Sequence, residues 1–403
     1  MSWLDDALDL APTDPFGVAN LPYGAFRGET AAGVGVRVGS HVLDLGRAEQ
    51  AGLLDAAGAL AARSNLDHLL VAGPPVWRRV RERLQQLLLE ARWRAEVEPL
   101  LMPLDRVRLA LPFTVGDYVD FYSSEHHAGN LGRILRPGQP PVLPNWHHLP
   151  VGYHGRGGTV VVSGTPVRRP CGQRKVGDGP VFGPSTRLDI EAEVGFVIGR
   201  PSRLGERVST EEFAAHVFGV VLVNDWSARD IQAWEYQPLG PFLGKSFATT
   251  ISAWVTPLDA LVSARVPAPV QDPPVLDYLR EKERFGYDLT LQVEWNGTVV
   301  SRPPFREIYW TPAQQLAHLT VNGASVRAGD LYASGTVSGP RRDQTGSFVE
   351  LTWNGTEPVT LVDGSERTFV QDGDTVTITA TAPGPDGAIL GFGDVTATIQ
   401  PAE

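Results

Sequence analysis

The sequence has little cysteine, little lysine and no long hydrophobic run. Its single cysteine, Cys171, excludes an intramolecular disulfide and a metal cluster built on cysteines. The longest uninterrupted apolar stretch is about as long as a strand, whereas a membrane-spanning helix needs roughly 20 apolar residues. Basic residues do not exceed acidic ones, and the formal net charge of −11 argues against a nucleic-acid-binding face. We therefore expect neither a membrane span nor a nucleic-acid partner.

Basic residues are also missing where a secretory leader would carry them. The amino-terminal stretch MSWLDDALDL is acidic instead, so we expect a cytoplasmic protein. Only three of the 35 basic residues are lysines, namely Lys175, Lys245 and Lys282. In a chain that otherwise uses arginine, a lysine is a candidate for a position that requires a compact ammonium group.

The length of 403 residues favours two domains. Residues 1–110 form a small separate unit in this interpretation, with strands over 33–45 and a helix over 76–98. From Leu111 onward, short β-rich segments alternate with turns that draw on 43 glycines and 33 prolines. The sequence therefore predicts a mainly β or α+β protein with a boundary near residue 110 and a second unit over 111–403.

The stretch LDIEAEVGF places Glu191 and Glu193 two residues apart in a strand-like run, so both side chains lie on one face. A solvent-facing pair would carry no function. The flanking residues Ile190, Ala192 and Val194 are apolar, however, and two carboxylates beside a core require a cation. A second carboxylate, Asp225, follows the apolar run VFGVVLVN, which predicts that it stands at the end of a buried strand. The alternative is a helix cap, since Asn224, Asp225 or Ser227 are each suited to that position.

After Asp225, the residues Arg229, Gln232 and Tyr236 fall on one stripe of a helix that Pro238 must end. Guanidinium, amide and phenol groups suit recognition of a carboxylate or an enolate, and the alternative is a solvated face. The following GPFLGKS is not a phosphate-binding loop, because three residues rather than four separate Gly240 from Gly244. Its lysine is Lys245.

A further polar stretch, GDYVDFYSSEHHAGNLGRILR, contains Asp120, Tyr122, His126, His127 and Arg136. A lone histidine is most often structural. Beside an aspartate and a metal site, a histidine becomes a candidate acid or base.

Long segments of the chain resemble the fumarylacetoacetate hydrolase family. The matching stretches occur in the order that the family has and span almost the whole chain: NLPYGAF, GDYVDFYSSEHHAGN, LPNWHHLPVGYHGR, SGTPVRRP, NDWSARDIQAWEYQPLGPFLGKSFATTISAW, VNGASVRAGDLYASGTVSG and GSFVELTW. The resemblance implies an N-terminal SH3-like β-barrel, then a mixed β-roll catalytic domain, and a homodimer.

The resemblance also implies roles for individual residues. The metal ligands would be Asp120, Glu191, Glu193 and Asp225, with Lys245 and Thr249 beside them. The general base would be His127, held by Glu350, and the donors to the reacting groups would be Lys245, Arg229 and Gln232. The residues that touch substrate would be Tyr122, Arg136, Tyr153, Gln232, Tyr236 and Thr336. Two departures from the family pattern are the doubled histidine, which leaves His126 as an alternative base, and Ala248 in place of a glycine.

The implied reaction is hydrolysis of a carbon–carbon bond in fumarylacetoacetate, which gives fumarate and acetoacetate and ends tyrosine and phenylalanine breakdown. Four carboxylates, with no cysteine among the implied ligands, favour Mg²⁺ or Ca²⁺. Related members of the superfamily act instead on acylpyruvates, oxaloacetate or dienoic acids. A non-catalytic β protein held together by the metal is the alternative from a different class, and it would leave Arg229, Gln232 and Lys245 without a shared purpose.

Overall fold

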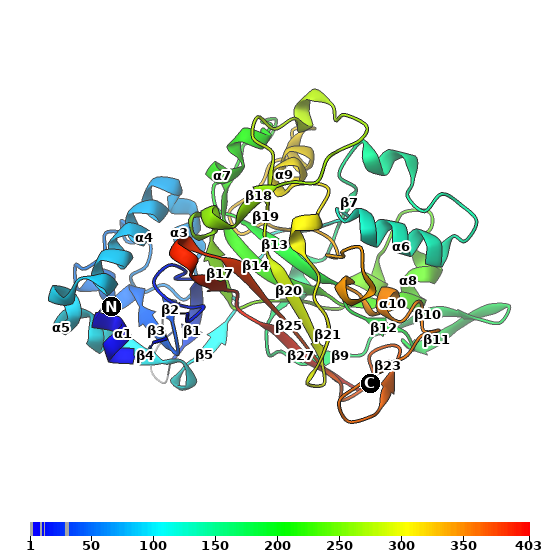
Figure 1. Ribbon diagram of the computed structural model, residues 1–403, viewed down its shortest axis with the longest axis horizontal. Coiled ribbons are helices and arrows are strands. Elements are labelled where there is room, and N and C mark those ends of the chain that lie inside the picture. The colour runs from blue at the N-terminus through cyan, green and yellow to red at the C-terminus, as the bar shows by residue number, and fades with distance from the viewer. Residues whose placement is uncertain (1–2, 9, 12, 29–31) are drawn as a thin grey trace.

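The computed structural model describes residues 3–8, 10–11, 13–28 and 32–403. Its N-terminal part, blue to cyan in Figure 1, lies at one end of the molecule, and the remaining chain forms a larger body around two sheets. The fold is a sheet-rich α+β fold, as expected. Of the acidic stretch MSWLDDALDL, Trp3–Leu8 forms helix α1, while Met1, Ser2 and Asp9 lie outside the described residues.

The larger sheet has 13 strands among the described residues. Their bounds are β1 Tyr23–Arg27, β2 Ala32–Val38, β3 His41–Asp44, β4 Leu101–Pro103, β5 Arg108–Ala110, β6 Tyr118–Phe121, β7 Gly152–His154, β8 Val160–Val162, β13 Ala192–Ile198, β14 Val217–Asp225, β16 Thr249–Ile251, β17 Trp254–Pro257 and β22 Leu331–Ala333. The order along the sheet is β4-β3-β2-β1-β17-β14-β13-β22-β6-β7, with β5 beside β1 and β16 between β14 and β8.

The second sheet has six strands in the described chain and packs across the first (Figure 1). It contains β9 Val167–Arg168, β20 Thr290–Trp295, β21 Thr298–Ser301, β25 Thr375–Pro383, β26 Ile389–Gly391 and β27 Val395–Gln400. Strand pairs outside the two sheets are β10 Cys171–Val176 with β11 Gly179–Pro184, β12 Leu188–Asp189 with β15 Ser227–Ala228, β18 Arg265–Pro267 with β19 Phe285–Tyr287, and β23 Val359–Thr360 with β24 Glu366–Arg367.

The helices are short apart from α4 and α6. Their bounds are α2 Leu45–Gln50, α3 Asp67–Ala72, α4 Pro74–Leu89, α5 Arg94–Val97, α6 Glu125–Leu135, α7 Phe213–His216, α8 Arg229–Glu235, α9 Pro312–Thr320 and α10 Phe348–Leu351. The strands expected over 33–45 are β2 and β3. The helix expected over 76–98 is interrupted after α4, because Glu90 adopts an extended backbone. No helix in the described ranges is both long enough and apolar enough to cross a membrane.

The N-terminal strands do not close into a barrel within the described residues. Strand β1 pairs with β2 and β5, but it also pairs with β17 of the larger body, where Gly24 lies opposite Trp254. A Cβ at Gly24 would come within 2.6 Å of the Trp254 ring, so glycine permits the close approach. The sheet therefore continues from one unit into the other, and the expected SH3-like barrel is not found in this geometry.

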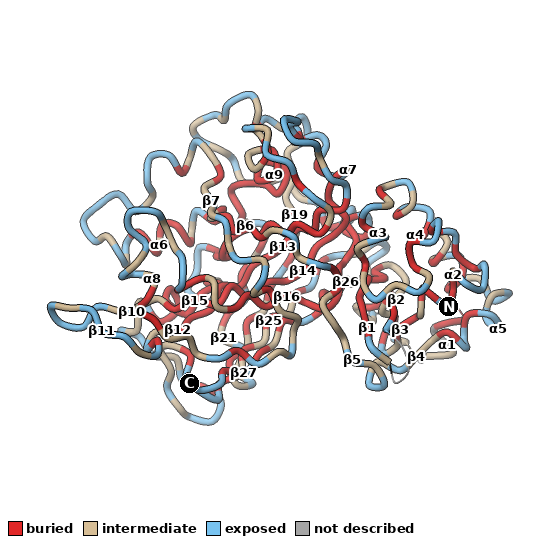
Figure 2. Tube along the Cα trace, turned by 180° about the vertical axis from the view of Figure 1, so that it is seen from behind, coloured by how far each residue is buried: buried red, intermediate tan, exposed pale blue. Residues whose placement is uncertain are grey.

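The central strands β13 and β14 are buried along their whole length and appear as red tube in the middle of the larger body in Figure 2. In β14, Val220 and Leu222 pack into one hydrophobic cluster, whereas Val221 and Val223 pack into another. A strand covered on both faces explains the uninterrupted apolar run in the sequence. The run ends at Asp225, the last residue of β14, which confirms that this carboxylate stands at the end of a buried strand.

Candidate active site

Neighbouring strands of the large sheet deliver the carboxylates. Asp120 lies in β6, Glu193 lies in β13, and Glu191 directly precedes β13. Strand β22 joins these two strands, because its Ala333 pairs with Asp120 on one side and with Gly195 on the other. All three carboxylates are buried, so the solvent-facing alternative for the glutamate pair is wrong.

Asp120, Glu191 and Glu193 form a compact acidic cluster. One oxygen of each lies within 4.8 Å of the others. Both oxygens of Glu193 are without a hydrogen-bond partner among the described residues, and so is Oδ1 of Asp120. Burial, together with the neighbouring carboxylates, holds the pKa of Asp120 and of Glu193 well above the ordinary carboxyl range. Buried, unpaired oxygen ligands of this kind fit a hard divalent cation.

Asp225 is held by donors rather than gathered into this cluster. Its Oδ1 accepts from the Thr249 hydroxyl at 2.9 Å, and its Oδ2 accepts from the Tyr153 hydroxyl at 2.9 Å. Lys245 Nζ lies 2.7 Å from the same Oδ2. Asp225 does not cap the following helix, since the residue at the N-cap of α8 is Ala228. Three of the four predicted ligands are thus together, and the fourth adjoins Lys245.

Lys245 is buried among carboxylates, as expected for a lysine at a position that requires a compact ammonium group. Its Nζ lies 2.5 Å from Glu191 Oε2 and donates to Ser227 Oγ at 2.9 Å. Burial alone would lower the pKa of this ammonium, but Asp225 and Glu191 outweigh burial and raise it above its usual range. Lys175 is exposed, and Lys282 forms an exposed ion pair with Glu211. Ala248, where the family pattern has glycine, packs in the core.

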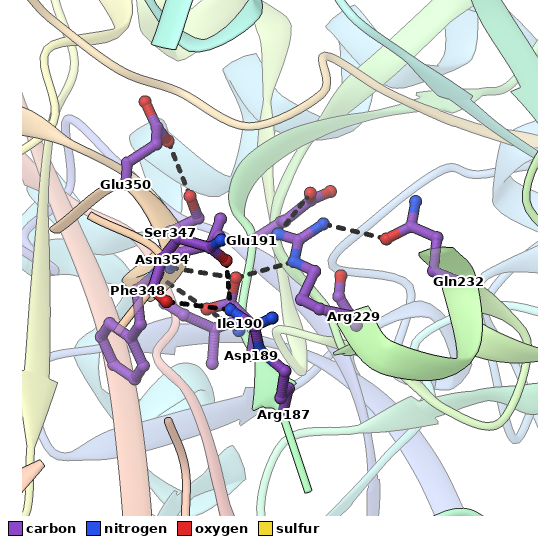
Figure 3. Close-up of polar contacts among 12 residues, drawn as sticks. Arg187, Asp189, Ile190, Glu191, Arg229, Gln232, Ser347, Phe348, Glu350 and Asn354 are labelled. Carbon is purple, nitrogen blue, oxygen red and sulfur yellow. Dashed lines mark hydrogen bonds and ion pairs between the residues drawn. The ribbon is translucent and has the colours of Figure 1, made fainter. Parts of the chain in front are cut away.

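The predicted stripe on α8 begins inside the site and ends at the surface. Arg229 Nη2 lies 2.8 Å from Glu191 Oε1, and Arg229 Nη1 donates to Gln232 Oε1 at 3.2 Å (Figure 3). Tyr236 follows the last helical residue and is 44% exposed. Helix α8 therefore ends before Pro238, as predicted, and only its first turn lies among the buried acids.

His127 is oriented by a buried carboxylate. Its Nδ1 lies 2.7 Å from Glu350 Oε2, and its Nε2 lies 3.9 Å from Glu191 Oε1. Glu350 belongs to α10 and also accepts from Ser338 Oγ at 3.0 Å and from Ser347 Oγ at 2.7 Å. Burial would raise the pKa of Glu350, but His127 and the hydroxyl and amide donors hold it below the ordinary value.

The neighbouring His126 makes none of these contacts. It is half-buried, on the same turn of α6 as His127. The side chain of Ser124 accepts from the backbone N–H of His127 at 3.2 Å and so caps the helix there. The geometry favours His127 over His126 as the ring that works with the acidic cluster.

The remaining predicted substrate residues divide into buried and peripheral ones. The Tyr122 ring packs edge-on against His127 with centroids 5.1 Å apart, and Thr336 is buried with no partner for its hydroxyl among the described residues. Thr336 follows Gly335, whose φ of +78° and close approach to the Phe121 carbonyl exclude a side chain there. Arg136 is half-buried and donates to the Pro141 carbonyl at 3.1 Å, so it lies nearer the surface, as Tyr236 does.

Sequence reasoning missed the residues that hold the site together. These are Asp189, which binds Arg229, and the donors Asn130, Ser338 and Ser347, which bind Glu350. Asp189 had a signal, because Asp189, Glu191 and Glu193 alternate along one strand-like run. Asn130 had none, since its partner Glu350 lies 220 positions away, whereas Ser347 and Ser338 lie 3 and 12 positions from Glu350.

Comparisons with known proteins identify the family to which the chain is similar. The family description "Fumarylacetoacetate (FAA) hydrolase C-terminal" matches residues 118–400, and "Fumarylacetoacetase N-terminal" matches residues 19–112. The chain is 43% identical to a fumarylacetoacetase of Arabidopsis thaliana, with 100% of each chain covered. It is 44% identical to a fumarylacetoacetase of Homo sapiens, with 98% of each covered.

Solved structures share the fold at lower sequence identity. A fumarylacetoacetate hydrolase from Exiguobacterium antarcticum superposes with a TM-score of 0.56 at 18% identity and covers 95% of this chain and 100% of its own. A maleylpyruvate hydrolase from Sphingobium sp. SYK-6, in complex with manganese(II) ion and pyruvate, has a TM-score of 0.54 at 15% identity, with 95% and 100% covered. Both comparisons establish the fold of the chain.

Proposed function

The chain belongs to the fumarylacetoacetate hydrolase family, and on that basis we propose that it hydrolyses fumarylacetoacetate to fumarate and acetoacetate, the last step of tyrosine and phenylalanine breakdown. The full-length fumarylacetoacetase relatives support this substrate. The observation that carries the proposal is the buried pair of His127 and Glu350 beside the acidic cluster. This arrangement places a base next to a candidate cation site.

The reaction is difficult because its leaving group is carbon. Water adds to the carbonyl carbon of the fumaroyl group, and the bond from this carbon to the acetoacetate part then breaks. The electron pair of that bond remains on the acetoacetate carbon as an enolate, which takes up a proton. The site must therefore activate water on one side and stabilise negative charge on the other.

The unpaired oxygens of Asp120 and Glu193 and the nearby Glu191 and Asp225 would hold Mg²⁺ or Ca²⁺, with Lys245 and Thr249 next to them. When bound, a hard divalent ion supplies positive charge that stabilises oxyanions of a 1,3-diketone. The donor set supports this assignment, since it consists of carboxylate oxygens. Burial and the neighbouring carboxylates raise the pKa of Asp120 and of Glu193, and Lys245 offsets this only in part, which supports the need for a further cation.

His127 is the proposed base. Its Nδ1 faces Glu350, which fixes that nitrogen as the N–H donor and leaves Nε2 free to accept a proton from water. Nε2 points toward Glu191 and hence toward the acidic cluster. Glu350 stabilises the imidazolium that forms, without accepting the proton itself.

The donors Lys245, Arg229 and Gln232 would stabilise the charge that develops on substrate oxygens. Lys245 and Arg229 both contact Glu191, so their positive groups are already in place. Substrate contacts are proposed for Tyr122, Arg136, Tyr153, Gln232, Tyr236 and Thr336. The buried Thr336 hydroxyl, which has no partner in the described chain, is available for such a contact.

The proposal includes the two-part organisation of the family. Residues 1–110 would form an N-terminal unit and residues 111–403 a β-roll catalytic unit, and two copies would act as a homodimer in the cytoplasm. The separate family matches to residues 19–112 and 118–400 support the division. All proposed site residues lie in the second unit.

The test is the decay of the enol absorbance of fumarylacetoacetate with purified protein. It is run with and without excess EDTA, and with Mg²⁺ or Ca²⁺ added back. We expect rapid decay, loss of activity in EDTA and recovery with a divalent ion. Absence of decay in every condition, together with turnover of an acylpyruvate or oxaloacetate, would replace the proposed substrate.

A further inference from the structure

Asp189 lies between Arg229, which contacts Glu191, and the start of helix α10, which carries Glu350. It is fully buried and accepts four hydrogen bonds. Its Oδ2 accepts from Arg229 Nε at 2.8 Å and from the backbone N–H of Val349 at 3.2 Å. Its Oδ1 accepts from the backbone N–H groups of Phe348 and Ile190, each at 2.8 Å. One carboxylate thus binds a side chain of α8 and the backbone of α10.

The partners of Asp189 are directly linked to the proposed reacting groups of the site. Phe348 and Val349 begin helix α10, and their N–H groups have no partner within the helix. The next residue, Glu350, orients His127. Arg229, on the other side, directs Nη2 at Glu191. Figure 3 shows Asp189 between the Arg229 guanidinium and the chain segment of Phe348.

We propose that Asp189 is a positioning residue that sets the catalytic base and the oxyanion donors in one fixed arrangement. It acts through two others: the carboxylate orients Arg229 and anchors the α10 backbone that carries Glu350. This inference rests on the proposed function, since it assigns the reaction roles of Arg229 and Glu350. The position requires a carboxylate, because asparagine would place its amide NH2 group against two of the four donors.

A neighbouring contact anchors the turn that follows α10. Arg187 donates to the backbone carbonyl of Asn354 at 2.9 Å and also to the Asn354 side-chain oxygen. Arg187 makes no contact with Arg229 through its side chain in the described structure, although its carbonyl accepts the Arg229 backbone N–H at 3.0 Å. Asp189, by contrast, contacts both Arg229 and the backbone of α10 with one side chain, so the positioning role is assigned to Asp189.

The principal test is the variant Asp189→Asn. A small displacement of a catalytic group costs up to ~10²-fold in rate, so we expect kcat to fall at least ~10-fold while KM changes less than about twofold. The matched control is Asp330→Asn. Asp330 is also a buried carboxylate that accepts a backbone N–H and pairs with an arginine, Arg327, but it lies outside the site. The control should melt at a lower temperature than wild type and keep its kcat.

A double-mutant cycle separates positioning from simple support of the fold. If Asp189 acts through Glu350 and Arg229, then Asp189→Asn should cost less in the Glu350→Gln and Arg229→Gln backgrounds than in wild type. Additive losses in both backgrounds, or an unchanged kcat in folded Asp189→Asn, would overturn the proposal. Should Asp189→Asn fail to fold, Asp189→Glu keeps the charge with a longer reach and should show the same loss of kcat at constant KM.

A readout that needs neither turnover nor a change at Asp189 distinguishes this inference from the proposed reaction. In Arg229→Gln, the Asp189 carboxylate loses one of its partners, so hydrogen–deuterium exchange in the peptide 347–352 should be faster than in wild type. Unchanged exchange there would overturn the link. An inactive wild type with faster exchange in Arg229→Gln would refute the proposed reaction and leave the link standing.

Discussion

The Nδ1 atom of His127 lies 2.7 Å from Oε2 of Glu350, and both side chains are buried. This contact joins α6 to α10 and leaves Nε2 facing the acidic cluster. Three further donors bind Glu350, with Ser338 and Ser347 at Oε2 and Asn130 at Oε1. Both oxygens of the Glu350 carboxylate are therefore held by donors, and this fixed carboxylate orients the imidazole of His127.

Replacement of His127 should remove the base without unfolding the protein. We expect His127→Ala to lower kcat by at least ~10²-fold, as loss of a general base typically does. The matched control is His126→Ala, which should retain near-normal turnover because His126 makes no contact with Glu350 or Glu191. Steady-state kinetics on both variants checks this prediction, and the reverse pattern would assign the base to His126.

Replacement of Glu350 should affect catalysis through His127. In Glu350→Gln the amide can no longer stabilise an imidazolium, and a comparable exchange of the carboxylate in a catalytic triad costs about 10⁴-fold in kcat. We expect a loss between ~10² and ~10⁴. Glu357→Gln is the control, since Glu357 forms a half-exposed ion pair with Arg342. Equal kcat values for the two variants would contradict the role of Glu350.

Replacement of Glu193 should weaken metal binding. Both of its oxygens are buried without a hydrogen-bond partner among the described residues, so we expect Glu193→Gln to lower Mg²⁺ or Ca²⁺ affinity by more than the ~10-fold that loss of an outer partner typically costs. Titration calorimetry measures the change. Glu49→Gln serves as the control, because the Glu49 carboxylate accepts only backbone N–H groups in the N-terminal unit. Equal affinity in both variants would remove Glu193 from the metal site.

Glu281 should make the stability depend on pH. Burial raises its pKa from 4.5 to about 7, against the hydrogen bond from Thr311 Oγ1. A raised pKa means that the folded protein keeps the proton longer than the unfolded chain, so this contribution to stability is full below pH 4.5 and is lost as the pH rises to about 7. The variant Glu281→Gln resembles the neutral acid. Its melting temperature relative to wild type should rise between pH 4.5 and 8; a constant difference would contradict the shift.

Local patterns in the sequence predicted the parts of the site that depend on a single element. The apolar run before Asp225, the helix ended by Pro238 and the scarcity of lysine each identified a feature that the structure contains. The alternation of side chains between the two faces of a strand also predicted that Glu191 and Glu193 point the same way. It did not reveal that Lys245 and Arg229 approach Glu191.

Contacts between distant segments could not be predicted in this way. Asp189 and Phe348 are hydrogen-bonded across 159 positions, and His127 and Glu350 across 223. The pairing of β1 with β17 extends one sheet across both units, and no periodicity in either strand specifies that partner. These contacts depend on the complete packing of the two sheets, whereas periodicity reports only which face of an element is apolar.

The most direct test of the account follows the oxygen of the attacking water. Fumarylacetoacetate is hydrolysed by the wild-type protein in H₂¹⁸O with Mg²⁺ or Ca²⁺ present, and the products are analysed by mass spectrometry. We predict one ¹⁸O per fumarate molecule, with no label introduced into the acetoacetate carboxylate, and formation of both products at least ~10²-fold more slowly in His127→Ala. Absence of carbon–carbon cleavage, or a fumarate without label, would contradict the hydrolysis proposed for this site.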